Sequence, residues 1–290
     1  MGASVVVTGA NRGIGLATAL ELASAGYDVI GTARAGDRAR ALLEAAGARG
    51  LALRTVLLDV ADAASTERGF AEIAELTGGG PWAVVNNAGF AQAGAIEDVD
   101  DAALRYQLEV NLVAPARIAR LVLPAMRERG EGRIVNMSSI AGRVSLPLLG
   151  WYCAAKHGLE AMTDALRMEV VQYGIRVVLI EPGSFGTGIW AGARYPDAAA
   201  TGDYAAAYRH ARTATARLAR FMPDPWWVAR AVRLALASPR PLARYLVGLD
   251  AVGGVVAETL TPTAVSDRAK EVVAGVRRPH GPAGVPAGSA

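Results

Sequence analysis

The chain has 290 residues and a formal net charge of +3 at pH 7, and 52% of its residues are hydrophobic against 20% charged. That balance is typical of a globular protein and excludes an intrinsically disordered chain. No run of about eighteen apolar residues predicts a membrane-spanning helix, and no long basic run indicates nucleic acid as a partner.

The elements predicted over the first 180 residues alternate between short β-branched runs and longer Ala- and Leu-rich stretches, the pattern of βαβ units. We expect strands at residues 4–8, 28–33, 51–58, 83–86, 132–137, 175–181 and 244–249. We expect helices at 14–25, 63–77 and 152–173, and a long one near 101–129. The sequence therefore predicts an α/β fold of the doubly wound (Rossmann) kind, with a mostly parallel sheet and helices on both faces.

Two later segments depart from this alternation. Residues 184–225 are rich in aromatic residues and arginines and are long for a plain connection, so we expect a lid over the substrate. Residues 277–290 are rich in Pro, Gly and Ala, which predicts a disordered tail. No interdomain linker interrupts the rest, so residues 1–276 are expected to form one domain.

Some residue types are scarce enough to be informative. Cys153 is the only cysteine, which excludes an internal disulfide and, together with the absence of a signal-peptide pattern, favours the cytoplasm. Only two of the thirty basic residues are lysines, Lys156 and Lys270, and only five asparagines occur, at positions 11, 86, 87, 111 and 136. The Ala-, Gly- and Arg-rich composition indicates a coding bias that removes lysine and asparagine. We therefore expect the lysines and asparagines that remain to lie where the chemistry requires them. No metal site is expected, because the three histidines are scattered.

A glycine-rich segment follows the first predicted strand and opens the first predicted helix. Glycines at this place let backbone amides approach a pyrophosphate, and the helix N-terminus adds partial positive charge. The sequence therefore predicts a dinucleotide site here. Its residues are Gly9, Asn11, Arg12, Gly13, Ile14 and Gly15.

The Gly-x-x-x-Gly-x-Gly spacing, with Asn86-Asn87-Ala88-Gly89 after the fourth strand, resembles the short-chain dehydrogenase/reductase family, in its branch of single-domain members. The resemblance covers residues 4 to about 250 and implies an NAD(P)-dependent oxidoreductase acting on CH–OH and C=O groups. It also implies further cofactor contacts along the chain. These are Asp59 and Val60 at the adenine, Asn87, Ala88 and Gly89 around the cofactor, and Pro182, Gly183 and Thr187 beside the nicotinamide.

The choice between NAD and NADP is an electrostatic one. NAD binders usually place an acidic residue after the second strand, whereas a 2′-phosphate calls for arginine. Here Arg34 lies just beyond that strand with no carboxylate at its tip, and Arg12 is a second cation nearby. We therefore expect NADP(H), with NAD(H) as the alternative.

The catalytic candidates lie between residues 139 and 156. Tyr152 and Lys156 are four apart, so they share one face of a helix, and the ammonium is expected to lower the pKa of the phenol. Ser139 precedes Tyr152 by thirteen residues and follows the fifth strand. Cys153 is rotated by about 100° from the Tyr152 face and is expected to be structural, and His157 is expected on the helix surface.

The family resemblance implies a role for each candidate. Ser139 would donate a hydrogen bond to the substrate oxygen, and Tyr152 would be the general acid for reduction and the general base for oxidation. Lys156 would hold the nicotinamide ribose and tune Tyr152. Asn111 would kink its helix and hold a water that relays protons to Lys156.

The substrate is expected to be a hydrophobic ketone or aldehyde, since the candidate walls are mostly apolar. These walls are Gln92, Val144, Leu149, Phe185 and Trp190. The composition would fit a bacterial enzyme of secondary or lipid-like metabolism, and relatives of this kind are commonly homodimers or homotetramers. Two alternatives remain: an NAD-linked alcohol dehydrogenase, and a catalytically silent nucleotide-binding sensor or scaffold.

Overall fold

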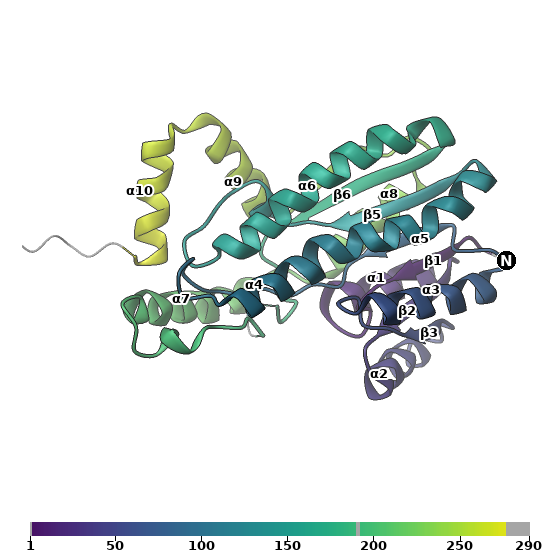
Figure 1. Ribbon diagram of the computed structural model, residues 1–290, viewed down its shortest axis with the longest axis horizontal. Helices are drawn as coiled ribbons and strands as arrows, with labels where there is room; N and C mark the ends of the chain where they lie inside the picture. The colour runs from purple at the N-terminus through teal and green to yellow at the C-terminus, as the bar shows by residue number, and fades with distance from the viewer. Residues whose placement is uncertain (1, 190–191, 277–290) are drawn as a thin grey trace, which may run out of the picture.

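The structure is a computed structural model that describes residues 2–189 and 192–276. Its strands form one parallel sheet of seven in the order β3-β2-β1-β4-β5-β6-β7 (Figure 1). The order reverses between β1 and β4, and this reversal is where doubly wound folds bind ligands. The strands are β1 (Ser4–Val7), β2 (Asp28–Ala33), β3 (Arg54–Leu57), β4 (Ala83–Asn86), β5 (Gly132–Met137), β6 (Ile175–Pro182) and β7 (Arg244–Val247).

Helices cover both faces of the sheet, which confirms the predicted fold class (Figure 1). They are α1 (Gly13–Ser24), α2 (Gly36–Gly47), α3 (Ala63–Thr77), α4 (Asp101–Leu108), α5 (Ala114–Arg129), α6 (Gly150–Val170), α7 (Ala205–Leu218), α8 (Trp226–Ala237), α9 (Leu249–Leu260) and α10 (Thr263–Ala274). A π-helical segment, η1 (Glu109–Val113), joins α4 to α5. Short 3-10 turns are η2 (Ile140–Gly142), η3 (Val171–Tyr173), η4 (Asp197–Ala199) and η5 (Ala219–Phe221).

Successive residues of the central strands enter different cores. Val5 and Val7 of β1 pack with Leu22 of α1 and Val232 of α8, whereas Val6 between them packs with Ile118 of α5. A strand points alternate side chains to opposite faces, so a strand covered on both faces must be apolar throughout. This explains why the predicted strands are continuous apolar runs rather than alternating ones.

The sequence located the inner strands most sharply. The predicted bounds of β2, β4 and β5 match the structure, but β3 begins at Arg54 rather than Leu51. The long helix predicted near 101–129 is present but interrupted by η1. The sequence analysis gave no bounds for five helices, α2, α7, α8, α9 and α10.

The C-terminal helices form a hairpin that reaches the predicted lid. Glu258 of α9 accepts hydrogen bonds from Ser266 and Lys270 of α10, both at 2.8 Å. His210 of α7 lies 3.2 Å from the carbonyl oxygen of Val273, so α7 and α10 are in contact (Figure 1). Among the described helices, none is long and apolar enough to cross a membrane. The predicted tail at 277–290 lies outside the described residues.

Candidate functional site

A groove opens at the carboxyl ends of β1, β2, β4, β5 and β6, beside the reversal in strand order. All the residues predicted to bind the cofactor line it, and so do the four predicted catalytic residues. They are Gly9, Asn11, Arg12, Gly13, Ile14, Gly15, Arg34, Asp59, Val60, Asn87, Ala88, Gly89, Asn111, Ser139, Tyr152, Lys156, Pro182, Gly183 and Thr187.

The glycine-rich loop approaches its neighbours too closely for side chains. A Cβ on Gly15 would lie 2.3 Å from the carbonyl oxygen of Gly9, and one on Gly13 would lie 2.9 Å from that of Thr187. Gly13 also has φ +55°, a conformation that favours glycine. The first amides of a helix have no partner within it, and Arg12 at the N-cap of α1 gives them no side-chain cap. These residues line the groove, where an anion could accept from their amides.

Asn87 fixes this loop to the end of β4. Its side-chain amide donates to the carbonyl oxygens of Thr8 and Gly9, at 2.9 and 3.3 Å. In return the hydroxyl of Thr8 accepts hydrogen bonds from the backbone amides of Asn87 and Ala88, both at 3.0 Å. The loop is therefore held in place by hydrogen bonds between two central strands.

Three predicted catalytic side chains, one at the N-cap of η2 and two on α6, meet at the other end of the groove. Tyr152 and Ser139 are hydrogen-bonded through their side chains. Lys156, one turn along α6, donates to the carbonyl oxygen of Met137 at 2.8 Å, and its Nζ lies 5.8 Å from the centre of the Tyr152 ring. Both Tyr152 and Lys156 are buried, at 4% and 5% exposure, so their charge states depend on the protein more than on solvent.

Burial sets the pKa values of this pair. It raises the pKa of Tyr152 to about 12, against a lowering by the hydrogen bond from Ser139, and it lowers the pKa of Lys156 to about 8, against a raising by Glu160. The expectation that Lys156 lowers the pKa of Tyr152 is wrong for the protein alone, because desolvation outweighs any effect of the ammonium. The phenol of Tyr152 is consequently protonated at neutral pH.

Asn111 lies in the π-helical segment, at the helix irregularity that the resemblance implied. Its side-chain amide donates to the carbonyl oxygens of Phe90 and Gln107, at 3.1 and 3.2 Å. Its Oδ1 is buried without a hydrogen-bond donor among the described residues and faces Gly89, where a Cβ would lie 2.8 Å away. This oxygen is an acceptor turned toward the groove, and π-bulges often occur at functional sites.

Four arginines line the groove, and two of them escaped the sequence analysis. Arg34 follows β2 and donates to the hydroxyl of Tyr106 at 3.3 Å, and Arg38 comes one turn later on α2. The guanidinium of Arg194 lies 4.9 Å from the ring centre of Phe90 and 5.0 Å from that of Tyr106. Within residues 2–189 and 192–276 none of these arginines, nor Arg12, forms an ion pair with a carboxylate.

Only some of the residues predicted to contact the substrate line the groove. Phe185 lines the groove, but Gln92, Val144 and Leu149 are absent from its lining. Gln92 is buried, with its side-chain amide directed to the carbonyl oxygens of Ala93 and Arg194, and Leu149 packs beside Tyr152. Trp190 lies outside the described residues.

Other lining residues carried no signal in the sequence. Ile189 packs against the cluster around Tyr152, and Gly192 and Arg194 belong to the predicted lid segment. Arg194 reaches the groove because residues 92 and 194 form a short parallel bridge. Arg38 lies on the first turn of α2, a helix that the sequence analysis did not predict. Its approach to the groove could be predicted only once that helix was placed.

The two residues judged not to be catalytic lie away from the groove lining. Cys153 is buried in the cluster behind Tyr152, and burial raises the pKa of its thiol. His157 is exposed, with its Nδ1 2.9 Å from the carbonyl oxygen of Cys153. Both placements agree with the structural roles expected for them.

A protein built this way binds a dinucleotide at the carboxyl edge of its sheet, with a proton donor beside the end of the groove. Residues 3–197 match the family model described as short chain dehydrogenase, and the chain belongs to the short-chain dehydrogenase/reductase family. It is therefore an NAD(P)-dependent oxidoreductase.

Three relatives illustrate the likeness. The oxidoreductase YbbO of Escherichia coli (strain K12), named as uncharacterized, is 35% identical over 91% of this chain and 93% of its own. The NADPH-dependent 3-dehydrocapnine reductase of Ornithobacterium rhinotracheale is 32% identical over 91% of this chain and 94% of its own. A crystal structure of a short-chain dehydrogenase from Streptomyces avermitilis superposes with a TM-score of 0.78 at 34% identity, covering 93% of this chain and 95% of that one.

Proposed function

We propose that this enzyme is an NADP(H)-dependent ketoreductase that interconverts a hydrophobic ketone or aldehyde and its alcohol. The observation that carries the proposal is the hydrogen bond between Ser139 and a buried, protonated Tyr152 at the end of a groove lined by arginines. A bound NADPH would supply the hydride. The chain itself supplies the proton and orients the carbonyl.

Each catalytic side chain has a definite task in this proposal. The hydroxyls of Ser139 and Tyr152 both donate to the substrate oxygen, which polarises the carbonyl and draws it to the end of the groove. Tyr152 then gives its proton to that oxygen as negative charge develops there. Lys156 holds the cofactor ribose and provides positive charge behind Tyr152, and Asn111 Oδ1 accepts a hydrogen bond in the relay that restores the proton.

The groove suits NADP(H). The unpartnered amides at the start of α1 and the close approach of Gly15 to Gly9 make a cradle for a pyrophosphate. Arg34 and Arg38 lie together at the end of β2 and the start of α2, where the adenosine ribose of a dinucleotide lies in this fold. Two guanidiniums without carboxylate partners favour a 2′-phosphate, and an unphosphorylated ribose would leave them unused.

The substrate is proposed to be apolar because Phe185 and Ile189 line the groove. Ile189 also packs against the cluster around Tyr152, together with Leu146, Leu149 and Ala193. The named relative from Ornithobacterium rhinotracheale is an NADPH-dependent reductase, which supports reduction as the direction. A role in bacterial lipid-like or secondary metabolism belongs to this proposal.

Residues 184–225 are proposed to act as a substrate lid. Thr187, Ile189, Gly192 and Arg194 all line the groove, and Thr187 crosses the glycine-rich loop. A homodimer or homotetramer through the Asn111 and Tyr152 helices stays a prediction, supported by exposed apolar residues such as Met168 on α6. The cytoplasmic location also stays a prediction.

Cofactor kinetics with a matched pair of arginine variants test the proposal. The measurement is kcat/KM for NADPH and NADH with a panel of hydrophobic ketones, for the wild type, Arg38→Ser and Arg40→Ser. Arg40 lies on the same helix but outside the groove lining. We expect the wild type to prefer NADPH, and Arg38→Ser to raise the KM for NADPH about tenfold without changing that for NADH, since a lost charged hydrogen bond is worth about 1.5 kcal/mol.

Arg40→Ser should keep the wild-type preference. Equal use of both cofactors by the wild type, or the same change in Arg38→Ser and Arg40→Ser, would contradict the NADP(H) assignment. Arg34→Asp extends the test, because a carboxylate there should repel the phosphate and shift the preference toward NADH.

A further inference from the structure

Two carboxylates face each other in the interior behind the catalytic pair. Glu160 follows Lys156 by one turn of α6, and Glu181 is the penultimate residue of β6, directly before Pro182 and Gly183 of the groove. Their exposures are 6% and 0%. Buried acidic side chains are rare unless they are paired, and neither one has a task in the reaction proposed above.

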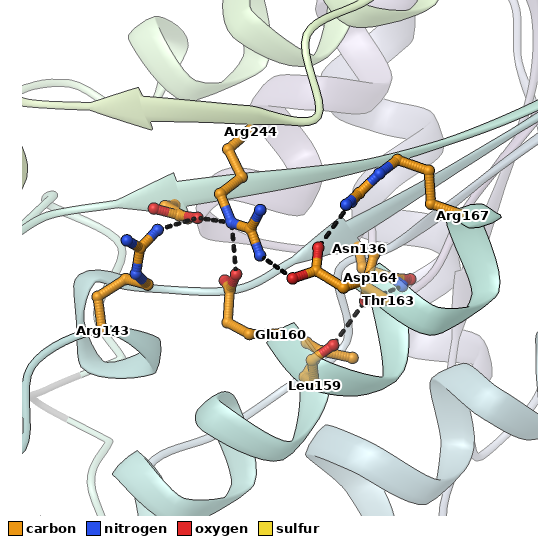
Figure 2. A network of polar contacts seen from close by, with 9 residues as sticks. Asn136, Arg143, Leu159, Glu160, Thr163, Asp164, Arg167 and Arg244 are labelled. Carbon is orange, nitrogen blue, oxygen red and sulfur yellow. Dashed lines mark hydrogen bonds and ion pairs between the residues drawn. The ribbon is translucent and has the colours of Figure 1, made fainter.

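Two arginines approach this carboxylate pair. The Nε of Arg244, from β7, lies 3.0 Å from Glu160 Oε2 and 3.1 Å from Glu181 Oε1, and its Nη2 donates to Asp164 (Figure 2). The Nη1 of Arg143 lies 3.6 Å from Glu181 Oε1. The guanidinium of Arg244 is therefore shared among three carboxylates.

The remaining oxygens of the pair lack donors. Glu160 Oε1 and Glu181 Oε2 are buried, and no described residue donates a hydrogen bond to either; Glu181 Oε1 has only its ion-pair contacts with Arg244 and Arg143. The two carboxylates are close neighbours, because Glu160 Oε2 and Glu181 Oε1 lie 3.0 and 3.1 Å from the same Nε of Arg244. Two ionised carboxylates have only acceptors and repel each other, whereas a proton on one of them removes the repulsion and supplies a donor for a buried oxygen that lacks one.

We propose that Glu160 and Glu181 share one proton at neutral pH, and that loss of this proton adds a negative charge that stabilises the protonated form of Lys156. As the pH rises, the shared proton leaves, and the second negative charge appears one helical turn from the ammonium at the pH where Lys156 would otherwise become neutral. Glu160 and Glu181 are positioning residues in this scheme, since they act through Lys156. Their effect on catalysis rests on the proposed function, whereas the shared proton does not.

The direction of each titration agrees with this scheme. Burial, and then the charge of Glu160, raise the pKa of Glu181 to about 7. Burial lowers the pKa of Lys156 to about 8, and Glu160 opposes that lowering. The carboxylate pair therefore loses its proton just below the range in which Lys156 titrates, and an added negative charge there holds the proton on Lys156.

The other charged groups around the pair are arginines and aspartates. Arginine is protonated at all relevant pH values, which covers Arg143, Arg244 and Arg167. The hydrogen bonds from Arg244 and Arg167 help to hold the pKa of Asp164 below its usual value. Asp250 of α9 is turned to the amide of Ser184. Gly142 leaves the room for this packing, since a Cβ there would lie 3.0 Å from Glu160 Cγ.

The scarcity of lysine makes the experiment direct. With Lys156 and Lys270 as the only lysines, lysine labelled with ¹³C at Cε gives two NMR signals, and Lys270→Arg assigns them. In the wild type we expect the Lys156 signal to move in two steps as the pH rises. A small step near pH 7 reports loss of the shared proton, and a larger step follows around pH 8 or above as Lys156 itself titrates.

Glu181→Gln and Asp164→Asn separate the pair from the rest of the network. Glu181→Gln keeps the shape of the protonated acid, so the small step should vanish and the larger one should move to lower pH by about half a unit to one unit. Glu160→Gln should move the larger step in the same direction. Asp164→Asn also loses a contact with Arg244 but leaves the carboxylate pair, so both steps should remain.

A wild-type titration in one step, with the same midpoint in Glu181→Gln, would overturn the inference. Because the NMR readout needs no turnover, it stands apart from the proposed ketone reduction. If the enzyme reduces ketones, the alkaline limb of its kcat/KM profile should also move to lower pH in Glu181→Gln and stay in place in Asp164→Asn. A shifted NMR titration in a protein without reductase activity would contradict only the proposed function.

Discussion

Lys156 shows how strongly one residue depends on its surroundings. Its ammonium is buried, which is costly, and it is stabilised by the carbonyl oxygen of Met137 and by the charge of Glu160. Behind it, the same burial raises the pKa of Glu181. The charge at the end of the groove is therefore set by residues that do not line it.

The free energy of unfolding should record the protonation of Glu181. Its pKa is raised from 4.5 to about 7 in the folded protein, so between these values the folded state binds more protons than the unfolded one. Stability from this residue is present below about pH 4.5 and is lost as the pH rises through about 7. Urea unfolding of the wild type from pH 5 to 7.5 should show a loss on the order of 1–3 kcal/mol from this group.

Glu181→Gln should flatten that decline, because glutamine does not titrate. Asp164→Asn is the matched control, since the pKa of Asp164 is lowered and its titration lies at more acidic pH. An equally steep decline in Glu181→Gln and the wild type would show that Glu181 is already ionised at pH 5.

Scarcity proved to be the useful sequence signal at single residues. All five asparagines have buried or groove-facing positions. Asn86 of β4 donates to Asn136 of β5 at 2.8 Å, and Asn136 donates to Thr163 of α6 at 2.8 Å, where both side chains are labelled in Figure 2. Arginine gave no such signal, because thirty basic residues less two lysines leave twenty-eight arginines. Arg38 and Arg194 were missed for that reason.

At the scale of elements, a buried tyrosine of α7 is hydrogen-bonded to the loop after β4. Tyr208 is fully buried; its hydroxyl donates to Asp98 at 2.6 Å and accepts from the backbone amide of Ala95 at 2.8 Å. Burial and the bond to Asp98 raise the pKa of this phenol. Tyr208 also packs against Leu148, four residues before Tyr152, so its contacts reach the segment that leads into α6.

Tyr208→Phe should remove these hydrogen bonds without disturbing the catalytic side chains. The amide of Ala95 and the carboxylate of Asp98 would lose a buried partner, so we expect the free energy of unfolding to fall by about 1–3 kcal/mol. The KM for the ketone should rise while the affinity for NADPH is unchanged. Urea unfolding and steady-state kinetics measure the two effects.

Tyr204→Phe is the control at the N-cap of α7, since the hydroxyl of Tyr204 donates to Glu97 at an exposed position. It should cost less stability than Tyr208→Phe and leave the KM unchanged. Equal effects in the two variants would show that Tyr208 has no special part in holding the proposed lid.

Some features of these elements were beyond sequence reasoning. Leu148 has φ +62°, a left-handed conformation that costs about 1–2 kcal/mol in a residue other than glycine. Packing against Tyr208 and a 2.7 Å hydrogen bond from the amide of Gly94 to its carbonyl oxygen hold it there. Both contacts come from segments distant in the sequence, so no local sequence pattern predicts the left-handed conformation of Leu148.

At the scale of the whole molecule, the site assembles from segments that only the sheet brings together. The groove joins residues from position 9 to position 194, because the strand order places β1 beside β4 and then β5 and β6. This part of the fold was predictable, since parallel βαβ units have one handedness and meet ligands at the reversal of order. The C-terminal helices were less predictable, because α9 and α10 follow the last strand and belong to no βαβ unit.

The most direct test of the proposed carbonyl reduction is the rate of NADPH-dependent ketone reduction in Tyr152→Phe. With Cys153→Ala as the control from the next position on α6, we expect Tyr152→Phe to lower kcat by a factor of about 10²–10⁴. Both variants should bind NADPH as the wild type does, and Cys153→Ala should keep most of its activity. A wild type that binds NADPH but reduces no carbonyl in a broad panel, or a Tyr152→Phe variant with the wild-type rate, would contradict the account.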